Sequence, residues 1–580
     1  MSFTRYVTTL GWLLAMLCAL GGAAFAAQQT ITLREQVRQR YGPELLSYPF
    51  SAPRGACAAE SVRVQGPRGA VPAQLTGVTY WPRTTSVRSA RLCFLADGLE
   101  PLATDLYTVS YGPRRATLPA PPADLAVRQD GESIEITTAH VGVRLLNGGT
   151  RYPAPAAAVA VPGVLRGMRL AQGPWQGGSA FTGEGRVTAW SSRLVEGGPL
   201  VAKVECRYDF ADGAVMTVTA QVTAGDSAVH WETHVSAANP AVTLEMRLPA
   251  VPGVKEAELP KGYGQWARDR TLPVTASADP LCYLSPDTSI VNINPDSPPT
   301  IRLIGAEGAE LQLRSRDPGA WVEPGKPFTY AGHAAFSLDM VGELFKGWRD
   351  KRLPVRYAED GTVTLGANLA AGWRKWSVSA GAPRVGIQLD WVKDLVLDWP
   401  QTTQHPHLFM SRAEIEAALR AKGAAEPVHW SQVTNPAMLK DMASWLERLG
   451  EYDVMRKVTD LEVAYDVLID SDRVTPEERR VYRAQMAYLG YVLADPRCWS
   501  MERGYVSGNP NMSASYTLSL GLLACLLPDH PMARAWADYA TGWMDHWLAA
   551  EGGENGEWRS EGVSYGGQVS YPPMLAYAIA

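Results

Sequence analysis

Residues 216–235, MTVTAQVTAGDSAVHWETHV, alternate apolar and polar side chains on both sides of a short turn. The runs 216–222 and 229–235 each repeat with a period of two, and the AGD turn at 224–226 separates them. Successive side chains of a strand point to opposite faces of the sheet. The alternation therefore predicts two antiparallel strands with one buried face.

The same period continues on both sides of this hairpin. Residues 134–145 alternate in the same way, and the NGG turn at 147–149 follows them. Several such strands separated by turns are typical of two packed sheets. We expect residues 125–400 to form a large antiparallel β-sandwich.

A smaller β-domain is predicted ahead of the sandwich, over residues 30–112. Short strand-like runs at 71–75, 89–95 and 107–112 are separated by glycine and proline. The proline-rich stretch 113–124 then predicts a semi-rigid linker.

Residues 1–26 have the features of a secretory signal. Arg5 supplies a positive charge, residues 10–20 form a short apolar core, and Ala24-Phe25-Ala26 offers small residues for cleavage. The apolar run is shorter than the roughly 20 residues that span a bilayer, and no later segment is long enough. We expect an exported protein, periplasmic or secreted, with no membrane attachment after cleavage.

Composition excludes some partners and leaves other questions open. The net charge of −5 gives no basic face for nucleic acid. The 19 tryptophans and 23 tyrosines suit stacking on sugars, but they equally suit the cores of large β-domains. Six cysteines remain after the signal, too sparse for a disulfide scaffold. Cys57 and Cys93 form either a bridge within the small domain or two buried thiols.

The period changes to that of helices after residue 405. Ser411 and Glu414 have the spacing of a capping box, and Asn435-Pro436 and Thr475-Pro476 are further helix starts. The expected helices are 411–421, 436–449, 451–470, 476–494, 513–527, 531–549 and the start of another over 568–580. Short connections predict stacked antiparallel pairs. The chain ends on an uncapped apolar run, so we expect the domain 405–580 to be incomplete.

Two polar, glycine-bearing segments of this helical region concentrate chemically useful side chains. The first, 501–513, contains Arg503, Asn509 and Asn511, and the second, 556–565, is GEWRSEGVSY. Polar loops at helix ends are common places for functional residues.

These segments resemble heparinase II/III-type polysaccharide lyases. HPHLFMS at 405–411 is similar to the segment that opens their helical toroid, and Glu561-Gly562-x-x-Tyr565 resembles the segment with their catalytic tyrosine. Asn511 precedes Tyr565 by 54 positions, close to the family's separation between its charge-neutralising Asn or His and its tyrosine. The resemblance covers about 405–580, under a third of the chain. It departs from the family in placing β-domains first and in lacking a later histidine.

The resemblance implies an (α/α) toroid, here incomplete, and β-elimination of an acidic, uronate-containing glycan without a cofactor. Tyr565 would take the C5 proton, and Asn511 would stabilise charge developing on the C6 carboxylate. The implied substrate contacts are Arg503, Asn509, Trp558, Arg559, Glu561 and His546. Asn509 and Asn511 are also suited to capping the helix expected from 513, and Tyr565 and His546 to core packing.

Two other functions remain open. Glu557 and Glu561 could act as the paired carboxylates of a glycoside hydrolase, since a β-sandwich followed by a toroid is the order of several such enzymes. However, both lie in one short segment, whereas such carboxylates flank the sugar. Alternatively, the β-domains bind carbohydrate and the protein is not an enzyme.

Two histidine groups have residue types that can bind a metal, but no metal is predicted. His230, Glu232 and His234 share one face of a predicted strand, a row typical of a solvated face. His405 and His407 flank Pro406 ahead of a helix, where we expect packing between domains.

Overall fold

The computed structural model describes residues 27–114, 123–260, 270–285, 300–315, 351–381, 388–421, 435–440, 442, 452–494, 510–551 and 571–580. By internal contacts they form two compact units. The first unit contains residues 27–33, 45–97 and 104–114, and the second contains the rest. The predicted β-rich front is confirmed, because the described strands before residue 380 form several antiparallel sheets. The predicted signal, 1–26, lies outside the described residues.

The small unit is built on two sheets of orders β1-β7-β3-β4 and β2-β6-β5. Their elements are β1 (Ala27–Arg34), β2 (Glu44–Ser51), the 3-10 turn η1 (Ala59–Ser61), β3 (Arg63–Gly66), β4 (Gly69–Val71), β5 (Ala73–Tyr80), β6 (Val87–Ala96) and β7 (Thr104–Tyr111). Phe94 of β6 packs on Tyr107 of β7 with 4.8 Å between ring centroids, which joins the two sheets through an aromatic core.

The second unit contains a ten-stranded antiparallel sheet. Its strands, in spatial order, are β11 (Gly148–Ala157), β14 (Arg186–Gly197), β15 (Val201–Phe210), β16 (Val215–Thr223), β17 (Ala228–Val235), β26 (Gly372–Ser379), β23 (Glu310–Ser315), β22 (Thr300–Ile304), β19 (Glu256–Leu259) and β20 (Arg270–Pro273). The hairpin predicted over 216–235 is confirmed as β16 and β17.

Two smaller sheets complete the β-part of this unit. One has five strands, β13 (Gly178–Gly183), β18 (Asn239–Leu248), β25 (Val363–Leu369), β24 (Leu353–Tyr357) and β21 (Cys282–Leu284). The other has four, β12 (Leu165–Leu170), β10 (Val141–Leu146), β9 (Ser133–Thr137) and β8 (Ala126–Gln129). Two 3-10 turns, η2 (Ala158–Ala160) and η3 (Ala306–Gly308), lie between strands.

Because side chains alternate along each strand, the ten-stranded and five-stranded sheets each have an apolar face, and these two faces pack together. Phe181 of β13 meets Tyr208 of β15 edge to face, with 4.8 Å between ring centroids. Trp231 and Trp376 are cross-strand partners, and both are fully buried. Burying one face of each sheet in this way removes a large apolar area from water, which is the main stabilising term of such a sandwich.

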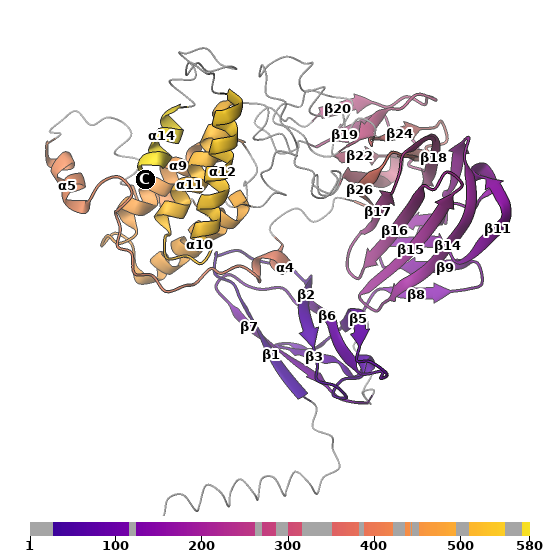
Figure 1. The fold of residues 1–580 in the computed structure, drawn as a ribbon, viewed down its shortest axis with the longest axis horizontal. Helices are drawn as coiled ribbons and strands as arrows, with labels where there is room; N and C mark the ends of the chain where they lie inside the picture. The colour runs from indigo at the N-terminus through magenta and orange to yellow at the C-terminus, as the bar shows by residue number, and fades with distance from the viewer. Residues whose placement is uncertain are drawn as a thin grey trace, which may run out of the picture. The chain divides into compact units, whose positions relative to one another are not determined.

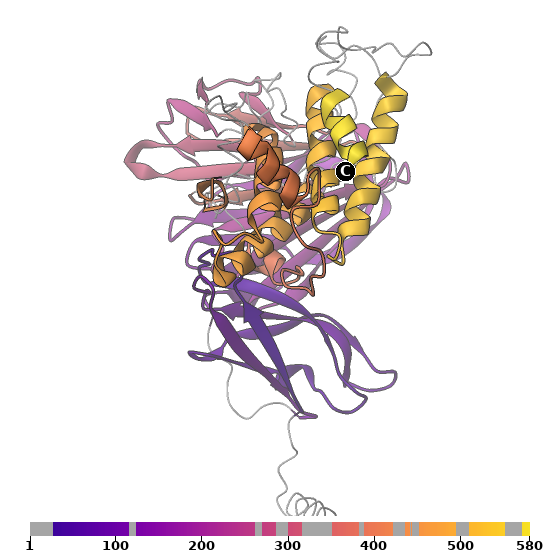
Figure 2. The same ribbon diagram turned by 90° about the vertical axis from the view of Figure 1, so that its left-hand side faces the viewer.

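The helices follow in sequence. They are α4 (Leu389–Val392), α5 (Arg412–Ala421), α7 (Ala437–Lys440), α9 (Tyr452–Leu468), α10 (Pro476–Ala494), α11 (Pro510–Leu526), α12 (Ala533–Glu551) and α14 (Tyr571–Ile579). α11 packs against α9, α10, α12 and α14. Figures 1 and 2 both show α14 beside α11 and α12. A closed toroid stays a prediction.

Local capping fixes two of the predicted helix starts. The Ser411 hydroxyl and amide each donate to the Glu414 carboxylate, at 2.7 and 2.8 Å. The Glu478 carboxylate accepts the Thr475 amide at 3.0 Å, and the Thr475 hydroxyl accepts the Glu478 amide at 3.2 Å. These reciprocal bonds satisfy amides that a helix start leaves free.

One predicted start was wrong by three residues. The helix expected from 513 begins at Pro510. Proline fits the first helical turn, because its fixed φ is helical and its missing N–H costs nothing there. Asn511 therefore lies inside the first turn of α11.

Two loops that interrupt the small β-domain belong by their contacts to the second unit. These are residues 34–44 and 98–103. The Gln485 side-chain amide of α10 donates to the Val37 carbonyl at 2.9 Å. The Glu44 carboxylate accepts the Leu389 and Asp390 amides at the start of α4. The two residues in each of these contacts are more than 340 positions apart, so no local sequence pattern predicts them.

Two sequence expectations are settled by the described residues. Cys57 and Cys93 are both buried free thiols, so the predicted bridge between them is wrong and the alternative of two thiols is confirmed. Cys57 lies beside Ser61, whereas Cys93 lies beside Ser47 and Thr76, so each sulfur packs in a different place. No helix in this part of the chain is long and apolar enough to cross a membrane.

Candidate functional site

Most of the predicted catalytic cluster lies outside the described residues. This applies to Arg503, Asn509, Glu557, Trp558, Arg559, Glu561 and Tyr565. The structure does place the backbone of the other two predicted site residues, with Asn511 in α11 and His546 in α12.

α11 and α12 form an antiparallel hairpin. Tyr577 of α14 touches both helices: its ring lies against Gly521, and its hydroxyl oxygen lies 2.9 Å from that of Thr541. At 1.5 Å rise per residue, Asn511 and His546 lie about 22 Å and about 20 Å from the connection between α11 and α12. Both therefore lie at the same end of the hairpin. α12 also ends there, at Glu551, and the polar segment with Tyr565 follows directly in sequence.

The hairpin is held by close packing around glycine. A Cβ on Gly521 would approach the Tyr577 ring to 2.4 Å, and one on Gly490 would approach Leu523 and Trp536 to 2.7 Å. Glycine at these positions lets α14 approach α11 closely, and lets α10 approach α11 and α12. The described part of α11 is almost wholly buried from Leu518 onward. The helix with Asn511 is thus a rigid central element, suited to fixing a functional group at its amino end.

A second polar centre lies where the chain enters the helices. The Asp466 carboxylate of α9 accepts a hydrogen bond from His405 Nδ1 at 2.8 Å. It also accepts the backbone amides of His407 and Leu408 at 3.0–3.1 Å. Asp529 fixes the preceding residues by accepting the amides of Thr402 and Thr403. These backbone hydrogen bonds hold the pKa of Asp529 well below its usual range.

His405, His407 and Asp466 are the one group of described residues with the composition of a metal site, since their ligand atoms lie within 4.8 Å of one another. However, both Asp466 oxygens already accept two hydrogen bonds each. The His405 ring is fully enclosed, and its Nε2 lies 3.0 Å from the Gln401 amide nitrogen. The Asp466 oxygens and the His405 ring nitrogens therefore already have partners within the protein. We interpret the group as a hydrogen-bonded clamp, meaning that it holds residues 401–408 in place. Its contacts are with α9, in the same unit, instead of the packing between domains that we expected.

The other histidine row also has protein partners. On β17, His230 lies 2.7 Å from Asp226, and Glu232 lies 3.7 Å from Lys375. His234 packs on Trp373 with ring centroids 4.4 Å apart. Among the described residues these three side chains do not converge into a metal-sized group.

Sequence reasoning missed a buried carboxyl group in α9. Glu462 is 0% exposed, and neither of its oxygens has a hydrogen-bond partner among the residues that the structure describes. Burial raises the pKa of Glu462 well above its ordinary value, because the charged form loses its hydration. Within the same described part of the chain, the Ser519 hydroxyl of α11 and the Tyr465 hydroxyl are also buried without a hydrogen-bond partner. The signal in the sequence was Glu462, an acidic residue between Leu461 and Val463 in the stretch LEVAYDV at 461–467, which also contains Asp466.

No family model and no curated protein matches the chain. Among solved structures, it is similar to a glycosyl hydrolase family 38 protein from Enterococcus faecalis, with 10% identity over 62% of this chain and 45% of that chain, at a TM-score of 0.32. It is also similar to the galactosidase domain of alpha-galactosidase-sucrose kinase, with 8% identity over 45% of this chain and 42% of that chain, at 0.24. A TPR-domain containing protein from Parabacteroides distasonis is 8% identical over 90% of this chain and 80% of that chain, at 0.23. The chain spans less than half the length of the first two. Similarity this low assigns no activity.

Proposed function

We propose that this protein is an exported carbohydrate-processing enzyme, and specifically a polysaccharide lyase that cleaves an acidic, uronate-containing glycan. The observation that supports it is the α11–α12 hairpin. It puts Asn511 at the end where α12 stops and the segment with Tyr565 begins. The spacing resembling heparinase II/III-type lyases thus coincides with one end of a rigid pair of helices.

The residue types suit β-elimination. Tyr565 removes the C5 proton of the uronate, the C4–C5 double bond forms, and the bond from C4 to the leaving oxygen breaks. The leaving oxygen takes up a proton, which the same tyrosine returns. Asn511 in the first turn of α11 stabilises the negative charge that builds on the C6 carboxylate, because its amide and the helix amino end both present positive dipole ends. Arg503 and Arg559 would add positive charge to the same carboxylate. Asn509, Trp558, Glu561 and His546 would contact the remaining sugar.

Hydrolysis is the second candidate, with Glu557 and Glu561 as the acidic pair. A hydrolase adds water across the glycosidic bond and leaves a saturated sugar. A lyase leaves an unsaturated uronate that absorbs in the ultraviolet, so the products separate the two chemistries.

The test is incubation of the full chain with alginate, pectin and glycosaminoglycans, following ultraviolet absorbance and reducing ends together. The lyase predicts both signals. We expect Tyr565→Phe to lower kcat by roughly 10²–10⁴-fold, as for loss of a general base. Asn511→Ala should lower it by roughly 10²-fold. The half-exposed Tyr152 of β11 provides a matched control, Tyr152→Phe, that should retain full activity.

Reducing ends without ultraviolet absorbance, lost in Glu557→Gln or Glu561→Gln, would replace the lyase by the hydrolase. Binding without either signal would leave only carbohydrate binding.

A further inference from the structure

An open hollow of about 690 Å³ lies on the small β-unit. Its lining is formed by the end of β2, the end of β5 and the start of β6, with the side chains of Ser51, Ala52, Pro53, Thr79, Trp81, Arg88 and Ser89. The volume is within the roughly 300–1,000 Å³ typical of small-ligand sites. The lining includes one cation and no carboxylate.

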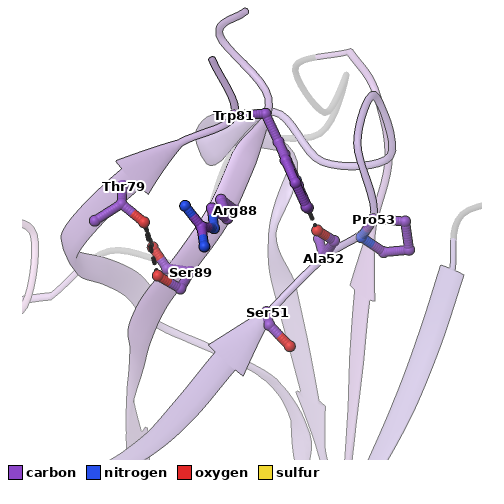
Figure 3. A pocket seen from close by; sticks show the side chains of 7 residues that line it. All are labelled: Ser51, Ala52, Pro53, Thr79, Trp81, Arg88 and Ser89. Carbon is purple, nitrogen blue, oxygen red and sulfur yellow. Dashed lines mark hydrogen bonds between the residues drawn. The ribbon is translucent and has the colours of Figure 1, made fainter.

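The aromatic ring in this hollow is held in place. The Trp81 indole N–H donates to the Ala52 carbonyl at 3.0 Å, and Trp81 itself is half-buried. Figure 3 shows this bond and the ring standing at one side of the hollow, toward Arg88. A fixed flat apolar surface flanked by polar groups suits the C–H face of a sugar ring, because little conformational freedom is lost on stacking.

The guanidinium of Arg88 gives the hollow its charge. It lies 5.5 Å from the centre of the Trp81 ring, and Arg88 is exposed. Among the described residues no carboxylate forms a salt bridge with it. A guanidinium offers paired N–H groups that match a carboxylate.

Hydroxyl groups complete the lining opposite the indole. Thr79 and Ser89 lie 2.7 Å apart through their hydroxyl oxygens, and both residues are exposed. Figure 3 places this pair on the far side of Arg88 from Trp81. Each hydroxyl can still donate or accept toward a ligand hydroxyl.

From these features we infer that the hollow at Trp81 and Arg88 binds a uronate unit of an acidic polysaccharide. The sugar face stacks on Trp81, the carboxylate pairs with Arg88, and ring hydroxyls meet Thr79 and Ser89. The inference extends the proposed function, because it assigns recognition of the same substrate class to a non-catalytic site.

Calorimetry with galacturonate and alginate trimers tests this, using the full chain with Tyr565→Phe so that no trimer is cleaved. Arg88→Ala should weaken binding at least tenfold, and so should Trp81→Ala. Carboxyl-reduced trimers keep the ring and lose the charge. They should bind the unaltered hollow at least tenfold more weakly than the acidic trimers do. The Arg88→Ala variant should bind reduced and acidic trimers with equal affinity. The exposed neighbour Arg54, which does not line the hollow, provides the control Arg54→Ala with unchanged affinity.

Ser89→Glu is a second variant, in case Arg88→Ala or Trp81→Ala weakens binding only by disturbing the fold. It adds a carboxylate beside Arg88 at an exposed position and leaves Trp81 in place. It should abolish binding of the acidic trimers. The inference is overturned if neither trimer binds, if Arg88→Ala and Ser89→Glu bind as the parent does, or if the reduced trimers bind equally well. Elimination by the wild-type chain is measured separately. If the trimers bind through Arg88 but are not cleaved by elimination, this site is retained and the lyase is rejected. If elimination occurs but Arg88→Ala does not change binding, the lyase is retained and this site is rejected.

Discussion

Asp466 accepts a hydrogen bond from His405 Nδ1 at 2.8 Å, and the two residues are 61 positions apart in the chain. The same carboxylate receives the amides of His407 and Leu408, so one side chain of α9 fixes the whole turn that enters the helices. Both residues are buried. Removing the Asp466 carboxylate would leave His405 Nδ1 and the Leu408 amide buried without an acceptor.

Asp466→Asn should therefore destabilise the helical region. An asparagine has nearly the same shape, but its NH₂ group is a donor. It would face N–H donors that the carboxylate oxygen accepts. We expect the free energy of unfolding to fall by about 3 kcal/mol, as for one lost partner of a buried charged network. Urea unfolding followed by far-ultraviolet circular dichroism measures it. Asp472→Asn, at an exposed position six residues on, is the control. Equal stability of the two variants would contradict the clamp.

Glu462 should make stability depend on pH. Its folded-state pKa is raised by burial, so between the ordinary pKa and the folded pKa the folded chain holds a proton that the unfolded chain releases. Stability then falls as pH rises above about 4.5, by up to about 1.4 kcal/mol per pH unit. Glu462→Gln should remove this slope between pH 5 and pH 7, whereas Asp460→Asn on the exposed side of α9 should keep it. An unchanged slope in Glu462→Gln would show that the carboxyl is ionised when folded.

Gly521→Ala should loosen the contact of α14 with α11. The added Cβ would meet the Tyr577 ring at 2.4 Å, and a rigid ring cannot yield without moving its helix. We expect a loss of about 1–3 kcal/mol in thermal or urea unfolding, typical of overpacking. Gly542→Ala in α12 has open space at its Cβ and should instead stabilise by up to about 1 kcal/mol through helix propensity. Tyr577→Leu should partly rescue Gly521→Ala, and failure of that rescue would place the strain elsewhere.

Cys57 and Cys93 should be recovered as thiols. Burial raises the pKa of the Cys57 thiol, which lowers its reactivity in the folded state. Alkylation after unfolding without reductant, followed by peptide mapping, should label both cysteines. A peptide pair joined through these two sulfurs would contradict the structure.

The sequence by itself determined the features that depend on near neighbours. Alternation in 216–235 predicted β16 and β17, and the Ser411–Glu414 spacing and the Thr475-Pro476 pair predicted two helix starts, because the interacting groups lie within a few residues. The prediction of the candidate catalytic residues likewise depends on local motifs and one sequence separation. Their side-chain geometry lies outside the described residues, apart from the backbone positions of Asn511 and His546.

Only the tertiary structure decided which distant groups meet. It joined Asp466 to His405, buried Glu462 among apolar helices, and assigned residues 34–44 to the unit that contains the helices. It also brought residues 51–53 into one hollow with Trp81 and Arg88, and kept Cys57 apart from Cys93. These outcomes follow from the packing of side chains far apart in sequence, for which spacing and periodicity carry no information.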